Sequence, residues 1–469
     1  MTHEPDAQEL VPDPAAEFFM DQRVRVTDAA RALFPDGTLI DLPHDQVQER
    51  LRATQVALAR GDPAIFEATF SEDGIVVVID ILALEDRSYT LIEVESSTSI
   101  NDHHLLDAAF KAYVLRRVGI EVDAVEIMHL NEECRSPDLS ELFVREAISG
   151  RVRHLFSQVS QLITDQNTML AGTLPAVEVG KHCNEPRECP FKTRCWPVLP
   201  LHHVETFYGL RQERSAELGA QGLVLVEDVP ETFPLTVIQQ RQQRSVTQGE
   251  LQVDGDLGVA LAPLDGRVAF LAFEAVGLAV PVWEGLGPWH PHPVQFSCHI
   301  ASPEEDLRQV EWLAEGSDDP RPGMARALVE TLEHVDVVVV YDKAFEKECL
   351  DLIAAGAPDY AKAVEAMKSK LHDLLPVVRN HVYHRDFLGS FSRTAVSSAL
   401  VPDLRRESPE VFQEQTTETL LNRLLFSGEP MEPAEREVVR RSLLANCAFE
   451  SLALVRLTER LDDLAKTPD

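Results

Sequence analysis

Two short runs of β-branched residues, in different halves of the chain, constrain its fold more than any other feature. Ile75–Ile81 reads IVVVIDI and Val335–Tyr341 reads VDVVVVY. Polar residues bound each run, as expected for a strand that is buried within a sheet. A chain of 469 residues is too long for one compact core, so the sequence predicts two α/β domains, each built around one of these strands.

Further elements surround the first run in a strand–strand–helix–strand order. Tyr89–Val94 predicts a second strand, and Val122–Leu130 predicts another. Asn101 is a suitable N-cap for a helix between them, and the apolar residues that follow it recur with helical spacing. We assign residues 1–196 to this first domain.

The pattern changes after residue 196. Prolines and polar residues interrupt residues 197–256, which we interpret as a small helical connecting module, and its Gln239–Arg244 stretch is most simply a solvated helix face. An α/β pattern returns over residues 257–469, beginning with a strand at Val268–Phe273. The helices predicted there are Ala344–Ala354, Tyr360–Leu375 and Glu435–Leu464.

Composition limits the classes of function. The formal net charge is -35, which disfavours tight, non-specific binding to nucleic acid because phosphate contacts need a basic surface. No stretch approaches the roughly 18 apolar residues that a membrane span needs. The N-terminus lacks the pattern of a signal peptide, and an odd number of cysteines, seven, fits reduced thiols. We therefore expect a cytoplasmic protein that does not contact membranes.

Three acids lie at or near the predicted strand ends of the first domain: Glu67, Asp80 and Glu93. Because side chains alternate along a strand, Glu93 and Glu95 point the same way, toward Asp80 if the two strands pair. Hard carboxylate ligands so placed suit Mg²⁺ or Mn²⁺. On geometry alone the simpler interpretation is that these acids are solvated strand ends.

Five runs in the first domain resemble a known family of nucleases. In order they read IFEATF, VIDILAL, LIEVESSTSIND, DAAFKAYVL and MHLN, and they are similar to the PD-(D/E)XK domain of the RecB-like class, which includes CRISPR-associated exonucleases. More closely, the chain resembles an uncharacterised bacterial family that fuses such a domain to an RNase H-like exonuclease domain. The resemblance implies a restriction-endonuclease-like fold, with Asp80 and Glu93 as metal ligands and Glu67 as an upstream acid.

The chain departs from this family at the residue on which the chemistry depends. Glu95 stands where the family has a catalytic lysine, and a carboxylate there repels the scissile phosphate instead of stabilising its charge. Lys111 stands where the family has a glutamine, so it either supplies the lost charge or pairs with Asp107 on the wet face of its helix. If the catalytic lysine is the only functional residue that is missing, Glu95→Lys restores metal-dependent cleavage.

A cysteine group closes the first domain. Cys183, Cys189 and Cys195 lie within HCNEPRECPFKTRCW, a spacing that suits a soft-ligand metal or cluster. In the resembled family, three such cysteines and a fourth near the N-terminus hold a [4Fe-4S] cluster, but this chain has no cysteine before Cys134. The fourth ligand here is Cys134, His182 or absent. The site therefore holds an iron–sulfur cluster, a zinc ion completed by His182, or no cofactor at all.

A second set of acids lies in the last domain. Six runs there resemble DEDD-type 3′–5′ exonucleases on an RNase H-like fold: VAFLAFEAV, PVQFSCHI, VVVYDKAFEKECL, KLHDLLPVV, VYHRDFLGSFS and LLANCAFESLALV. In that class an aspartate of the first motif bridges two metal ions. Here that motif reads Ala272-Phe273-Glu274, so the bridging aspartate is missing. The remaining candidate acids are Glu346, Asp373 and Glu450. Glu346 and Glu348 are otherwise surface acids on a helix, and Gly389–Ser392 is most simply a turn and helix cap.

These departures support three functional hypotheses. The first is a pseudonuclease, inactive at both sites, that acts as a binding or regulatory subunit with a protein partner. The second is an active DNA or RNA nuclease that uses Mg²⁺ or Mn²⁺ at the retained acids. The third is an acidic mimic of nucleic acid. A metal-dependent degradation assay separates the second hypothesis from the other two.

Overall fold

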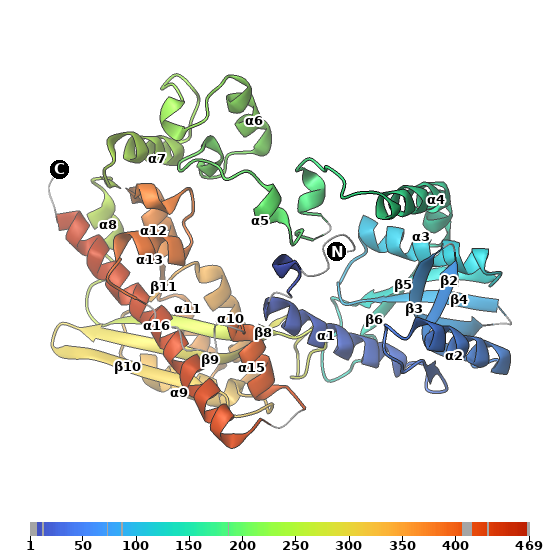
Figure 1. Ribbon diagram of the computed structural model, residues 1–469. Coiled ribbons are helices and arrows are strands. Elements are labelled where there is room, and N and C mark those ends of the chain that lie inside the picture. Colours follow the sequence, from blue (N-terminus) through green and yellow to red (C-terminus); the bar gives the residue numbers. More distant parts are fainter. Residues whose placement is uncertain are drawn as a thin grey trace. The chain divides into compact units, whose positions relative to one another are not determined.

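The computed structural model describes residues 7–11, 14–72, 74–85, 88–185, 187–405, 415–428 and 431–466. The chain divides into two compact units (Figure 1). Unit 1 comprises Met1–Trp196 and Gly277–His290, and unit 2 comprises Pro197–Val276 and Pro291–Asp469. Each unit is a mixed α/β structure built on its own sheet, in agreement with the α/β class that the sequence predicts.

The sheet of unit 1 has six strands that follow one another in sequence order. They are β1 (Thr38–Leu39), β2 (Ala64–Glu72), β3 (Ile75–Glu85), β4 (Ser88–Glu95), β5 (Val122–Leu130) and β6 (Phe143–Ala147). Strands β2, β3 and β4 pair antiparallel, whereas β4 and β5 pair in parallel through the crossover helix α3. The predicted strands in this unit are therefore confirmed, and β5 has the predicted bounds.

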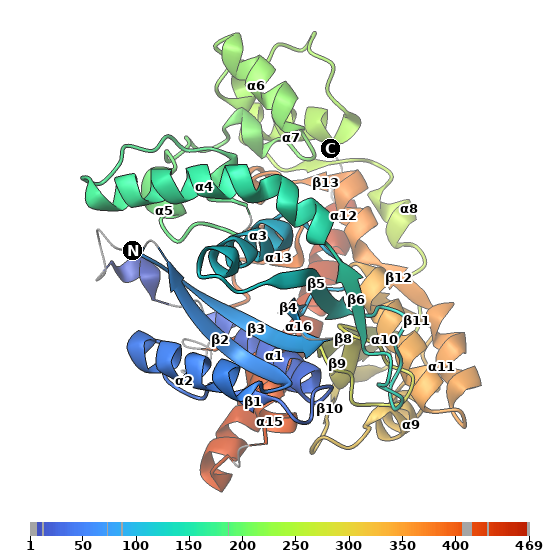
Figure 2. The ribbon, with the colours of Figure 1, turned by 90° about the vertical axis from the view of Figure 1, so that its right-hand side faces the viewer.

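Helices cover both faces of this sheet. They are α1 (Pro14–Arg31), α2 (Val47–Arg60), α3 (Asp102–Arg117), α4 (Ser149–Ala171) and α5 (Lys192–Cys195), with short 3-10 turns at Gln8–Leu10 and Lys181–Cys183. Figure 2 shows α3 and α4 packed side by side. Asn101 caps α3 as predicted, since its side chain accepts hydrogen bonds from the backbone N–H groups of His103 and His104.

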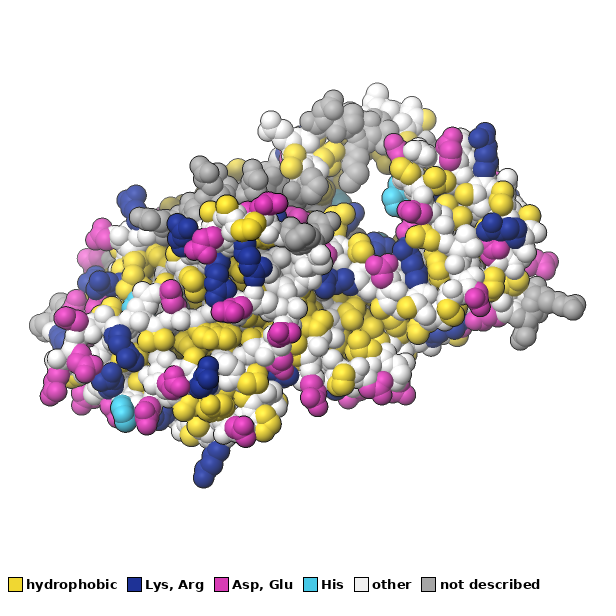
Figure 3. Space-filling view, turned by 90° about the horizontal axis from the view of Figure 1, so that it is seen from below, with side chains coloured by type: hydrophobic (Ala, Val, Ile, Leu, Met, Phe, Trp, Pro, Cys, Tyr) yellow, Lys and Arg dark blue, Asp and Glu magenta, His cyan; other side chains and the backbone are white. Residues whose placement is uncertain are grey.

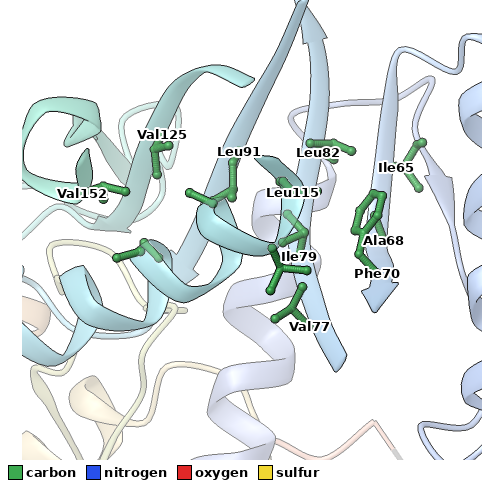
Figure 4. Close-up of a cluster of buried hydrophobic side chains, with 14 of the residues drawn as sticks. Ile65, Ala68, Phe70, Val77, Ile79, Leu82, Leu91, Leu115, Val125 and Val152 are labelled. Atoms are coloured by element: carbon green, nitrogen blue, oxygen red, sulfur yellow. The ribbon is translucent and has the colours of Figure 1, made fainter. Parts of the chain in front are cut away.

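Alternation along the strands divides the apolar side chains of unit 1 into two cores. Leu82 and Leu91 face α3 and α4, where Leu115 and Val152 meet them (Figure 4). Their neighbours point to the opposite face and pack against α1; Ile92 is an example. Burying each such side chain stabilises the folded state by about 1.5–3 kcal/mol. The alternation along the strands therefore determines which strand residues enter the two cores and which remain to face the candidate site.

The connection between two strands of the other sheet completes the core of unit 1. Residues 277–290 follow β8 (Val268–Gly277) and precede β9 (Pro291–Ser302) in the sequence, yet they pack with unit 1. Ala279 lies fully buried in the core cluster that α1 also lines.

The sheet of unit 2 has five strands in the order β10-β9-β8-β11-β12. The remaining strands are β10 (Glu305–Leu313), β11 (Val337–Val340) and β12 (Leu371–Asp373). Strand β11 runs parallel to both β8 and β12, and β10 runs antiparallel to β9. A separate two-stranded pair joins β7 (Gln252–Val253) to β13 (Val382–Tyr383).

The described helices of unit 2 pack either against the two faces of this sheet or in a separate apolar cluster. They are α6 (Gln212–Ala220), α7 (Val237–Gln248), α8 (Leu257–Leu261), α9 (Arg321–Leu332), α10 (Lys343–Gly356), α11 (Ala361–Lys368), α12 (Leu374–His381), α13 (Arg393–Leu400), α15 (Thr417–Leu425) and α16 (Pro433–Lys466). Alternate residues of β8 face α9 and α10 on one side and α12 and α16 on the other. None of the described helices is long and apolar enough to cross a membrane.

Two predictions about helices in this half of the chain are wrong. The Gln239–Arg244 stretch is not a solvated face, because Gln239, Arg241 and Gln242 are buried in α7. Their polar ends form hydrogen bonds with other loops, and these bonds offset the free-energy cost of removing the side chains from water. The helix predicted over Tyr360–Leu375 ends at Lys368, and strand β12 follows, because Leu371–Asp373 pair with β11.

Candidate functional site

Neighbouring strands bring two of the predicted acids of unit 1 together. Asp80 lies on β3 and Glu93 on β4, and the backbone N–H of Val94 donates a hydrogen bond of 2.9 Å to Asp80 Oδ2. Glu93 is buried, with only 2% of its side chain exposed. Among the described residues, nothing hydrogen-bonds its second oxygen, Oε1. The strand pairing therefore fixes one carboxylate at a buried position and a second beside it.

A lysine lies among these acids. Lys111 projects from α3, its Nζ contacts Glu93 Oε2, and it lies 2.9 Å from Asp107 Oδ2 one helical turn earlier. The lysine side chain is only 13% exposed. The predicted pair with Asp107 is confirmed, but its predicted place on a wet helix face is wrong, because α3 turns this residue toward β4.

Burial and charge work in opposite directions within this cluster. Burial raises the pKa of the Glu93 carboxyl, while the ammonium of Lys111 opposes the rise. Burial alone would lower the pKa of Lys111, but the charges of Glu93, Asp80 and Asp107 outweigh it and raise that pKa. Lys111 is therefore a permanent cation in this site.

Glu95 lies on the same face of β4 as Glu93, as predicted from the pleat. Burial, followed by the charge of Asp80, raises the pKa of Glu95 to about 7. Its Oε2 lies 3.6 Å from His104 Nε2 on α3. A carboxyl with this pKa is only partly ionised at neutral pH, so it is a weak metal ligand and supplies no positive charge for a phosphate.

Glu67 is held by arginines. Its Oε1 lies 2.5 Å from Arg31 and its Oε2 lies 3.0 Å from the buried Arg50. Although its own burial acts in the other direction, these hydrogen bonds lower the pKa of Glu67. Both oxygens of Glu67 are therefore occupied by ion pairs that hold α1 and α2 to the sheet.

Two of the predicted acids of unit 1, Glu67 and Asp80, line a cleft of about 590 Å³. Asp80, Asp107 and Lys111 line it together with Arg23 and Arg31 from α1. Cations and carboxylates thus alternate along its wall, and it is not the basic groove that a phosphate backbone requires.

The three predicted cysteines line one pocket of about 390 Å³, together with His182. Cys183 is buried, Cys189 is half-buried and Cys195 is exposed. Cys134 is not in this pocket, since it is buried in the core cluster beneath α1. Among the described residues, no group of three or more His, Cys, Asp or Glu side chains is arranged to hold a metal ion, so neither the cysteines nor the acids form a ready-made metal site.

The second acid cluster forms around β8 and α10. Glu274 lies on β8 two residues after Ala272, which is buried where the resembled family carries its bridging aspartate. Glu346 on α10 is 4% exposed, and no described residue hydrogen-bonds its Oε2. Burial raises the pKa of Glu346 to about 8. The surface interpretation is therefore wrong for Glu346, whereas Glu348 is exposed.

Asp373 has a structural role at the end of β12. Its carboxylate caps α12 by accepting a hydrogen bond of 3.0 Å from the N–H of Leu375. It also accepts bonds from the N–H groups of Asp342 and Lys343, at 2.9 and 3.2 Å. These bonds fix the turn that begins α10, and so they also position Glu346.

An arginine, Arg393, contacts one acid of the second cluster and acts on another. Arg393 forms an ion pair of 2.5 Å with Glu450 on α16. Its charge also opposes the rise in the pKa of Glu346. Ser392 caps α13 directly before Arg393, so the predicted turn and cap at Gly389–Ser392 is confirmed, and it positions this arginine.

Arg393 and the two arginines on Glu67 were not among the predicted site residues. A signal for Arg393 was available, since it follows the predicted cap directly. On the face drawn in Figure 3, Lys and Arg side chains are scattered among Asp and Glu side chains and form no continuous basic field.

Part of unit 2 matches a known protein family. Residues 269–392 match a family model described as "Domain of unknown function (DUF2779)". The matched segment contains Glu274, Glu346 and Asp373, but it ends before Glu450 and includes no acid of the first cluster. Searches of curated proteins and of solved structures give no match.

Proposed function

We propose that this protein is a pseudonuclease: a chain derived from two nuclease domains that acts as a binding or regulatory subunit with a protein partner. One observation carries the proposal. In each unit a side-chain cation, Lys111 or Arg393, lies among the acids that would otherwise bind catalytic metal ions. Such a cation compensates buried carboxylates and lowers the affinity for a divalent ion.

The arrangement of strands supports the nuclease ancestry. In unit 1, the candidate acids lie on paired antiparallel strands that are followed by a helix and a parallel strand, the order expected of a PD-(D/E)XK core. In unit 2, the five strands lie in the order third, second, first, fourth, fifth, which is the order expected of an RNase H-like sheet. Fold alone does not give activity, so the chemistry of the two sites decides the function.

Charge argues against hydrolysis at either site. In unit 1, a metal ion at Glu93 would have to displace a buried ammonium, and Glu95 has the wrong sign to stabilise a phosphate. In unit 2, Ala272 offers no ligand to bridge two metal ions, and Glu346 remains mostly protonated at pH 7. The loss of a bridging carboxylate costs about 10³-fold in rate or more.

A nuclease assay combined with a metal-binding measurement tests the proposal. We expect the purified protein to leave single- and double-stranded oligonucleotides intact in Mg²⁺ or Mn²⁺. We also expect electron paramagnetic resonance to show no tightly bound Mn²⁺. Lys111→Gln should raise Mn²⁺ affinity at the first cluster, whereas Lys368→Gln, which removes a lysine that bridges Asp351 and Glu365 on the surface, should not. Digestion of an oligonucleotide by the wild-type protein, stopped by EDTA, would refute the proposal.

The placement of Lys111 also favours a second candidate, an active nuclease in which this lysine replaces the missing one. The lysine reaches the cluster from α3 and contacts Glu93 directly. Under this alternative, Lys111→Gln abolishes cleavage. Under the pseudonuclease proposal there is no cleavage to lose, and Glu95→Lys alone does not restore it because Lys111 still holds Glu93. The double variant Glu95→Lys/Lys111→Gln then tests restoration.

The cysteine pocket remains a separate prediction. An iron–sulfur cluster or a zinc ion there would require a fourth ligand besides Cys183, Cys189 and Cys195, and His182 is the candidate that lines the same pocket. Iron and zinc analysis of anaerobically purified protein checks this prediction.

A further inference from the structure

The connection between β8 and β9 contacts unit 1 through a set of specific hydrogen bonds. The Trp289 indole N–H donates to the carbonyl oxygen of Ser96 at 2.6 Å. The backbone N–H of Ala279 donates at 2.9 Å to Oε1 of Gln22, a fully buried side chain on α1. Buried polar groups that find such partners make their contacts directional, so this segment is held in one register.

Two backbone hydrogen bonds join the same segment to the loop after β5. The N–H of Ser136 donates to the carbonyl of Leu286 at 2.9 Å, and the N–H of Gly285 donates to the carbonyl of Ser136 at 2.8 Å. Close packing favours glycine at position 287, because a Cβ there would lie 3.0 Å from the carbonyl oxygen of Cys134. Few residues other than glycine allow a backbone to approach another so closely.

The segment also buries apolar side chains. Leu278, Ala279, Trp283 and Leu286 are each at most 4% exposed. Trp289 has a left-handed backbone, with φ of 62°, which is unfavourable for a bulky residue and persists only where surrounding contacts impose it. Burial, directional bonds and tolerated strain together identify a docked element and not a loose loop.

We propose that residues 277–290 are an intramolecular strap whose docking in unit 1 holds the two halves of the chain together without the covalent connection at residues 196–197. The strap supplies part of the core of unit 1, so residues 1–196 do not form a complete domain. It also fixes Ser96, the residue after Glu95, so the loop behind the first acid cluster depends on a segment from the second half of the sequence.

Cutting the full chain at its exposed connector tests this directly. Val198 is 95% exposed, so a specific protease site can be inserted there and cleaved in the folded protein. We expect the two pieces to elute together in native size-exclusion chromatography. Separation of the pieces without denaturant would overturn the proposal.

Variants of the strap identify what holds the pieces together. Leu286→Ala should raise the dissociation constant of the cut pieces about 30-fold or more, because a buried leucine is lost. Val282→Ala is the matched control, since Val282 lies in the same segment but is 44% exposed, and its dissociation constant should not change. Trp289→Phe, which keeps a ring but removes the donor to Ser96, should raise it several-fold even if Leu286→Ala fails to fold. Equal affinities for all variants would show that other contacts join the pieces, and would refute the strap.

Discussion

Lys111 shows how one side chain changes the chemistry of a whole site. Its ammonium lies among Glu93, Asp80 and Asp107, where the two strand acids alone would form an anionic cluster. Arg393 has the same effect on Glu450 in the other unit. At the scale of single residues, both clusters therefore resemble stable ion pairs more than vacant metal-binding sites.

The buried pair in unit 1 predicts a large effect on stability. Lys111→Met leaves Glu93 buried without compensation, which should lower the free energy of unfolding by about 3–5 kcal/mol. Adding Glu93→Gln should recover most of this loss. Lys368→Met, which removes the surface pairs with Asp351 and Glu365, should cost less than about 1 kcal/mol. Urea denaturation measures all three, and equal losses for the two lysines would contradict the prediction.

The raised pKa of Glu346 predicts a pH dependence of stability. Between its unfolded value of about 4.5 and its folded value of about 8, the folded state binds more protons than the unfolded state. Stability should therefore fall as pH rises through this window, by up to about 1.4 kcal/mol per pH unit. Glu346→Gln removes this contribution, so the variant should gain stability relative to wild type between pH 5 and pH 8. Parallel urea curves at both pH values would contradict this assignment.

At the scale of elements, α7 shows polar residues holding a fold together. Its Arg241 is buried, pairs with Asp254, and donates to the backbone carbonyl of Arg379 at 3.0 Å. Its Gln242 accepts a hydrogen bond of 3.0 Å from the N–H of Tyr208. Helix α7 therefore joins the connecting module to β7 and to the end of α12, and it does so through side chains that composition alone assigns to solvent.

A matched pair of variants on α7 tests this role. Arg241→Ala should destabilise unit 2 by about 3 kcal/mol, because several buried acceptors lose their donor. Arg244→Ala removes an exposed arginine from the same helix and should change stability by less than about 0.5 kcal/mol. Thermal unfolding of both variants gives the comparison, and similar melting temperatures would show that the buried network contributes little.

At the scale of the whole molecule, the net charge of -35 determines what the surface attracts. Three positive side chains at the candidate sites are paired with acids: Lys111 with Glu93, Arg31 with Glu67, and Arg393 with Glu450. A paired cation releases no counterions from nucleic acid, so it adds little to binding.

This charge predicts weak binding to nucleic acid. A fluorescently labelled single-stranded DNA should bind with a dissociation constant weaker than about 100 μM at physiological salt. Fluorescence anisotropy measures it, and a salt titration gives the control, because a shallow dependence on salt indicates few phosphate contacts. Micromolar binding with a steep salt dependence would instead favour the active nuclease.

The sequence by itself determined the elements and the positions of the acids. The β-branched runs, the Asn101 cap and the helical spacing after it indicate local structure, and local structure depends on residues that are near one another in the chain. The strand positions of Asp80 and Glu93 follow from the same patterns, whereas the strand predicted at Val268–Phe273 ended directly before Glu274, which lies within β8. The missing family residues, at Glu95 and Ala272, are also visible without a structure.

Only the tertiary structure decided what these acids contact. Lys111 and Asp107 are one helical turn apart and pair as predicted, but the contact of Lys111 with Glu93 depends on which way α3 faces β4. Arg393 and Glu450 are brought together by two separate helices, and the strap joins residues that are nearly 200 positions apart in the chain. A local pattern carries no information about such distant partners, because burial and pairing arise only when separate elements pack.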